Sequence, residues 1–94
     1  MFEIETGPDG EILLSGRLDA TQVEKAREVL LALDESRTVD FSKLEYIASA
    51  GLGVLLATQK MLGSKGCSIR LVNLNNHIRD VLHFSGFDQI FEIG

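Results

Sequence analysis

The sequence is poor in residues that mark several common protein classes. Cysteine occurs once, at Cys67, which excludes an internal disulfide and a multi-cysteine metal site and fits a reducing compartment. Proline also occurs once, and the 94 residues are 45% hydrophobic and 24% charged, so global disorder is not expected. No apolar run approaches the roughly 20 residues that a membrane helix needs. We expect a single folded domain spanning residues 1–94.

Basic clusters are absent as well. The net charge is −5 and the lysines and arginines are scattered, so neither a nucleic-acid surface nor a polybasic membrane anchor is expected. The first ten residues, MFEIETGPDG, have neither the basic start nor the apolar core of a signal peptide. We therefore expect a cytoplasmic protein without direct membrane insertion, for which a basic protein partner is plausible.

The first third of the chain predicts a hairpin and a helix. Phe2 and Ile4 alternate with glutamates, residues 7–10 have strong turn chemistry, and the alternation resumes at Ile12. Thr21 and the glutamate three residues later resemble a capping box, and apolar residues then recur at helical spacing up to residue 33.

The rest of the chain predicts alternating strands and helices. Residues 39–41 form a brief strand followed by a polar turn, and a helix runs from about residue 50 to 62, with residues 58–60 facing water. Residues 67–71 alternate as another strand, Asn75 or Asn76 caps a third helix, and Gly86 ends it. Residues 90–93 form a short strand or a docked tail. The expected fold is α/β: a mixed four- to five-stranded sheet with an N-terminal β-hairpin and three to four helices.

Ser49 is the main candidate functional residue. It lies at the start of the second long helix, where unpaired backbone amides and the positive end of the helix dipole suit a phosphate. Its loop follows a strand, so it is expected at the edge where ligands and partners dock in such sheets. The alternative is structural, because a serine at a helix start is commonly an N-cap.

Three segments resemble the STAS domain of bacterial anti-sigma factor antagonists: GRLDA, VDFSKLEYIASAGLGVLL and LVNLNNHIRDVLHFSGFDQIFEI. The resemblance covers essentially the whole chain. It implies a non-enzymatic protein without cofactors that binds an anti-sigma factor, which is also a GHKL-type serine kinase and supplies the ATP. Phosphorylation of a serine at the start of the second helix then breaks the complex, and a serine phosphatase restores it.

The chain departs from the usual acceptor motif of that family. The motif reads Asp-Ser-Ser-Gly or Asp-Ser-Thr-Gly, whereas this chain has Ala48, Ser49, Ala50 and Gly51. Ala50 therefore occupies the usual acceptor position and has no hydroxyl. Either Ser49 is a shifted acceptor, or the phosphorylation switch is lost.

The expected partner-binding face surrounds this motif. Asp19 matches a family residue near the acceptor, although an aspartate before a helix is often only a cap. Gly51 and Gly53 cost helix stability, which suggests either close approach of a partner or a tight contact between helix and sheet. The predicted face comprises Asp19, Ala48, Ser49, Ala50, Gly51, Leu52, Gly53, Asn73 and Asn75.

Two other functions are compatible with parts of the sequence. STAS domains also serve as subunits of transporters or larger signalling complexes, where no phosphorylation is needed, and Ala50 favours this alternative. A nucleotide-binding domain has little support, because Gly-Leu-Gly lacks the rest of a phosphate-binding loop. A metal site is not expected, because His77 and His83 lie six residues apart in one helix and do not share a face.

Overall fold

The chain folds into a five-stranded sheet whose strands lie side by side in sequence order. The computed structural model describes residues 1–94 and contains β1 (Phe2–Thr6), β2 (Ile12–Leu18), β3 (Arg37–Ile47), β4 (Ile69–Val72) and β5 (Glu92–Ile93). β1 pairs antiparallel with β2, and all other neighbouring strands are parallel. The predicted α/β class, the opening hairpin and the antiparallel edge are confirmed.

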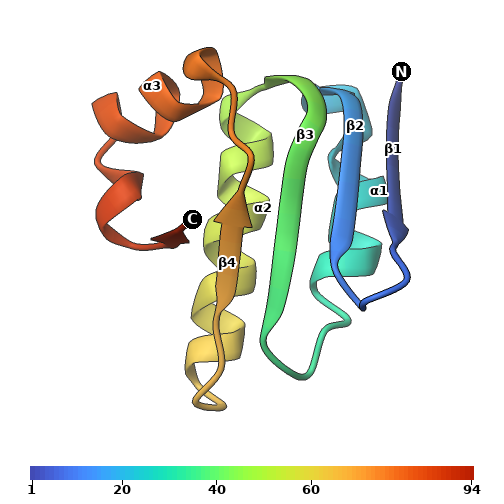
Figure 1. Ribbon diagram of the computed structural model, residues 1–94, viewed down its shortest axis with the longest axis vertical. Coiled ribbons are helices and arrows are strands. Elements are labelled where there is room, and N and C mark those ends of the chain that lie inside the picture. Colours follow the sequence, from blue (N-terminus) through green and yellow to red (C-terminus); the bar gives the residue numbers. More distant parts are fainter.

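Three α-helices connect the parallel strands. These are α1 (Val23–Leu30), α2 (Ser49–Gly63) and α3 (Asn76–Phe84), accompanied by the short 3-10 helices η1 (Ala20–Gln22) and η2 (Phe87–Gln89). In Figure 1, α1 and α2 lie behind the sheet and cover one face, whereas α3 lies beyond β4. The face of the sheet toward the viewer carries no helix over β1, β2 and β3, and we call it the open face. None of the helices combines the length and apolarity needed to cross a membrane.

One hydrophobic core lies between the sheet and its helices. It contains 21 buried apolar residues, including alternate residues of β2 and β4. This pattern follows from the two-residue repeat of strands, which sends every second side chain to the covered face. Since burial of one large aliphatic side chain contributes about 1.5–3 kcal/mol, this single cluster holds the sheet and helices together.

β3 is much longer than the brief strand predicted for residues 39–41. No polar turn follows that segment, because Asp40 and Ser42 both lie within β3. Its buried residues are Val39, Phe41, Leu44 and Ile47. Two register shifts against β2 break the simple alternation, so polar residues that resemble a turn in the sequence lie on the open face of a continuous strand.

Two details of the helices also differ from the prediction. The capping box at Thr21 is not formed; Asp19 instead caps η1, and α1 begins at Val23 without a side-chain cap.

Thr58, predicted to face water, is fully buried and its hydroxyl donates to the carbonyl of Val54 at 2.8 Å. Gln59 is half-buried, and its side-chain amide accepts from the N–H of Ile69. A helix that packs between neighbours on several sides has fewer solvent-facing positions than an amphipathic surface helix.

The end of the chain follows the predicted pattern closely. Asn75 caps α3 by accepting from the N–H of Ile78 at 2.8 Å. Gly86 follows the helix in the left-handed conformation, with φ 78°, which suits glycine. The final segment forms β5, a strand of only two residues that pairs with Arg70 and Leu71.

Candidate functional site

The predicted site lies where β2 and β3 end, at the top of the sheet in Figure 1, whereas β4 ends lower, beside Asp40 of β3. Asp19 directly follows β2, Ala48 and Ser49 follow β3, and Asn73 follows β4. The backbone N–H of Ala48 donates to the carbonyl of Leu18 at 2.9 Å, which ties the first two of these connections together. Because the carboxyl ends of parallel strands share one edge, residues far apart in sequence meet here. We call this edge, with the first turn of α2, the carboxyl edge.

Ser49 is the first residue of α2 and is exposed to solvent. Ala48 occupies the N-cap position in an extended conformation, so no side chain caps this helix, and no acidic residue lies in its first turn. The Ser49 hydroxyl makes no hydrogen bond within the chain. Ser49 is therefore not the N-cap of α2, contrary to the structural alternative. The helix start therefore presents an available hydroxyl and uncapped amides, a setting with positive potential.

The glycines of α2 have opposite environments. Gly51 is buried, and a Cβ atom there would lie 2.9 Å from side-chain atoms of both Leu18 and Ile47. Its small size allows α2 to pack tightly on the sheet, which agrees with the tight contact between helix and sheet that was one of the two predicted reasons for this glycine. Gly53 is exposed, and a Cβ atom there would have no neighbour within 4 Å. Leu52, between them, is 6% exposed and contributes to the core, so Gly53 is the only one of these three residues whose surface is open.

Asp19 acts as a cap in this structure. Its carboxylate accepts from the Thr21 hydroxyl at 2.6 Å and from the Thr21 N–H at 3.0 Å. The hydroxyl bond is the main reason that the pKa of Asp19 lies below its usual value; the Thr21 amide and the positive charge of Arg17 act in the same direction. Asp19 is thus a fixed negative charge beside the start of α2.

The asparagines after β4 are held by hydrogen bonds to β3. Asn73 has a left-handed backbone, with φ 58°, and its side-chain amide donates to Asp40 at 3.2 Å. Asn75 donates to the carbonyl of Leu44 at 3.1 Å in addition to capping α3. Burial acts to raise the pKa of Asp40, but hydrogen bonds from the Ser42 amide and from Asn73 outweigh it and lower the pKa. Both asparagines are exposed, but Asn73 lies beside Asp40, seven residues before the end of β3, so the structure does not bring it to Ser49 as the predicted face requires.

A second cluster near this edge was missed by sequence reasoning. The Arg17 guanidinium lies 4.5 Å from the centre of the Tyr46 ring, and the His77 ring stacks on Tyr46 at 6.3 Å with an interplanar angle of 16°. The three residues come from β2, β3 and α3, so no local periodicity relates them. Arg17 and Tyr46 both lie within the segments that carry the family resemblance, but only the register of β2 against β3 pairs them.

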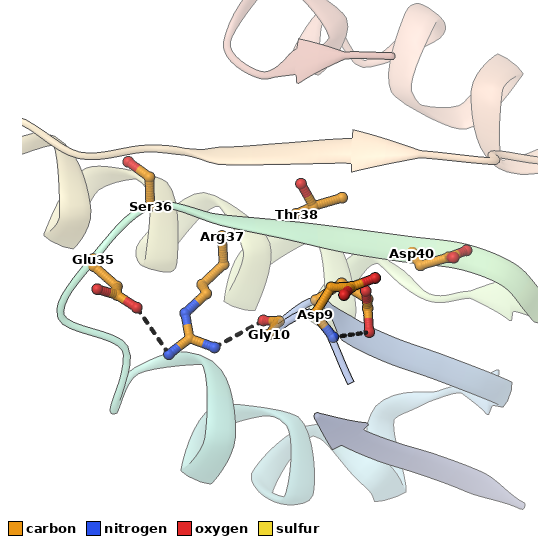
Figure 2. A pocket seen from close by; sticks show the side chains of 8 residues that line it. Asp9, Gly10, Glu35, Ser36, Arg37, Thr38 and Asp40 are labelled. Carbon is orange, nitrogen blue, oxygen red and sulfur yellow. Dashed lines mark hydrogen bonds and ion pairs between the residues drawn. The ribbon is translucent and has the colours of Figure 1, made fainter. Parts of the chain in front are cut away.

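The opposite edge of the sheet has an acidic depression of about 480 Å³, lined by Asp9, Glu11, Glu35 and Asp40 around Arg37. Figure 2 shows the Arg37 side chain between Glu35 and Gly10. Arg37 donates to the Gly10 carbonyl at 2.7 Å and pairs with Glu35 at 3.2 Å. These contacts tie the hairpin turn to the start of β3, which is a structural role.

The architecture agrees with the comparisons to known proteins. A family described as Mlab, STAS domain, matches residues 3–92. The chain belongs to the STAS domain family. The chain is 37% identical over 76 residues to a protein of Bordetella bronchiseptica named as a putative anti-sigma factor antagonist, BtrV. The alignment covers 80% of this chain and 66% of that relative. It is 28% identical over 88 residues to the anti-sigma-B factor antagonist of Bacillus subtilis, covering 90% and 81% of the two chains.

Solved STAS structures share the fold. The anti-sigma factor antagonist SpoIIAA in its unphosphorylated form aligns with a TM-score of 0.78 and 23% identity, over 100% of this chain and 88% of that one. At this identity the likeness establishes the architecture. The STAS fold of the present chain therefore follows from the family match and the structural alignment together.

Proposed function

We propose that this STAS domain is an anti-sigma factor antagonist that binds its partner through the carboxyl edge and is switched off by phosphorylation of Ser49. One observation carries the proposal: Ser49 presents an exposed, unbonded hydroxyl at an uncapped helix start. The names of the Bordetella and Bacillus relatives support the same class of function.

The switch acts through charge and size at the first turn of α2. In the unmodified state a partner packs against small, neutral groups, namely Ala48, Ala50 and the open surface at Gly53. A phosphoryl group on Ser49 adds about −1.5 to −2 charges there, beside the fixed negative charge of Asp19. The complex then separates because the partner meets a bulky, strongly hydrated dianion, while the domain itself keeps its fold.

The proposed partner is an anti-sigma factor that is also a serine kinase of the GHKL type. It supplies ATP and the catalytic groups, so the STAS domain is substrate and ligand in the cytoplasm. A serine phosphatase returns the domain to its binding state.

The test combines mass analysis with a matched pair of variants. Intact-mass measurement of the protein from its native host, followed by peptide mapping, is expected to show a phosphate adduct on Ser49. Ser49→Ala is expected to lose the adduct, whereas Ser42→Ala, at another exposed serine, is expected to keep it. A phosphate mapped to any other residue, or no adduct under all growth conditions, would contradict the proposed switch.

A second candidate function is supported by Ala50. This residue stands at the usual acceptor position of the family and has no hydroxyl, as expected for a STAS subunit that binds constitutively within a transporter or signalling complex. Affinity purification distinguishes the two functions. A stable membrane transporter complex without phosphate supports the subunit role, and a kinase partner with phosphate on Ser49 supports the switch.

A further inference from the structure

The stack of Arg17, Tyr46 and His77 holds a cation that makes no ion pair within the chain, although its charge acts on Asp19 two residues along. The chain holds 14 acidic and 9 basic residues, so carboxylates are abundant. Three of its basic side chains form ion pairs with them, namely Lys25, Arg27 and Arg37. Arg17 is exposed, its guanidinium makes neither an ion pair nor a hydrogen bond within the chain, and it lies over the Tyr46 ring.

The stack also restricts the orientation of Arg17. A guanidinium held over an aromatic face keeps its plane, and its N–H donors point away from the ring in a planar fork. Tyr46 is half-buried and is itself covered on the α3 side by His77, so the platform under the guanidinium is fixed. The unbonded N–H donors of this planar guanidinium match the two oxygens of a carboxylate.

The position of the stack connects it to the carboxyl edge. Arg17 lies two residues before Asp19, Tyr46 two before Ala48, and His77 two after Asn75. The strand register pairs Arg17 with Tyr46, next to the bonded ends at Leu18 and Ala48. A polypeptide that contacts the start of α2 and continues onto the open face passes over this stack.

We propose that Arg17, Tyr46 and His77 form a receptor for a carboxylate side chain that a protein partner presents on the open face. Charge favours a protein ligand over a nucleic acid, because a chain of net charge −5 repels a polyanion while one arginine can bind one carboxylate. The proposal extends the partner surface beyond Ser49 and requires neither phosphate nor a kinase.

The test is an NMR titration of the unphosphorylated protein with a blocked hexapeptide of alternating glutamate and glycine. Signals of the Arg17 side chain and of the Tyr46 and His77 rings are expected to shift together as the peptide binds. Arg17→Gln is expected to weaken binding about threefold, within the range that exposed ion pairs show. Arg17→Lys keeps the charge without the planar fork, so its affinity for the peptide is expected to lie between those of the wild type and Arg17→Gln.

Arg70→Gln is the matched control. Arg70 is an exposed arginine of β4 that also makes no ion pair, and it pairs in register with Thr38, distant along β3 from Tyr46. Its removal is expected to leave peptide affinity unchanged. Equal weakening by both variants, shifts confined to other residues, or equal shifts with an oligonucleotide of the same charge would each overturn the carboxylate receptor. None of these outcomes depends on the phosphorylation state of Ser49, so the two proposals fail separately.

Discussion

The N–H of Ala48 donates to the carbonyl oxygen of Leu18 at 2.9 Å, and this bond closes the gap between the ends of β2 and β3. It sets Asp19 and Ser49 on one side of the sheet before any ligand arrives. Because Asp19 is held by its hydrogen bonds to Thr21 and Ser49 lies in the backbone of α2, the proposed partner-binding edge is already assembled in the free protein. Assembly before binding lowers the entropic cost of association.

The two glycines of α2 are expected to respond in opposite ways to alanine. Gly51→Ala places a Cβ atom 2.9 Å from Leu18 and Ile47 side-chain atoms, and overpacking of this kind costs about 1–3 kcal/mol. The better helix propensity of alanine returns about 1 kcal/mol, so a net loss of about 1 kcal/mol is expected. Gly53→Ala meets no neighbour and is expected to stabilise by up to about 1 kcal/mol. Urea denaturation measures both; a stabilising Gly51→Ala would show that α2 can shift away from the sheet.

Asn75 and Asn76 are adjacent asparagines with different roles. Asn75→Ala removes the cap of α3 and the bond to Leu44, and is expected to lower the free energy of unfolding by about 1–2 kcal/mol. Asn76→Ala is the control, because the Asn76 side chain is exposed and makes no hydrogen bond within the chain. Its expected change is within about 0.5 kcal/mol. Similar losses for both variants would contradict the assignment of Asn75 as the cap.

Ser49→Asp is expected to separate stability from binding. A carboxylate in the first turn of α2 interacts favourably with the uncapped amides, which is worth about 0.3–1 kcal/mol at an exposed site. The free energy of unfolding therefore rises slightly, while affinity for the anti-sigma factor falls because a charge now occupies the contact. Calorimetry with purified partner measures the second effect. Unchanged affinity with Ser49→Asp would place the contact elsewhere on the domain.

Asp40 predicts a specific dependence of stability on pH. Its pKa in the folded state is lowered, while the unfolded value is about 3.9, so its stabilising effect is complete above that value. The effect is lost as the pH falls through the folded pKa, because Asp40 is then protonated in both the folded and the unfolded state. The stability difference between wild type and Asp40→Asn is expected to be largest at neutral pH and to shrink toward about pH 2.5. Urea titrations at both pH values test this, and a difference that grows in acid would contradict it.

Local signals predicted the elements that depend on local chemistry. The turn after β1, the cap at Asn75 and the left-handed Gly86 each follow from the residue itself. The placement of Ser49 at the carboxyl edge also followed, because it requires only that a strand precede a helix in a parallel sheet.

Features set by pairing between strands could not be predicted in the same way. The two register shifts between β2 and β3 turn an apparent loop after Phe41 into strand, and no single-strand pattern encodes them. The contact of Arg17 with Tyr46 depends on that shifted register. The burial of Thr58 depends on the elements around α2, not on the helix alone.

The helical segments beyond β4 limit how other chains can associate with this margin of the sheet. Because α3 and η2 stand beyond β4, little of this margin is free for another strand to join. Recognition by strand addition is thereby disfavoured on this flank. A partner on this flank would therefore have to recognise side chains, which single substitutions can alter without disturbing the sheet.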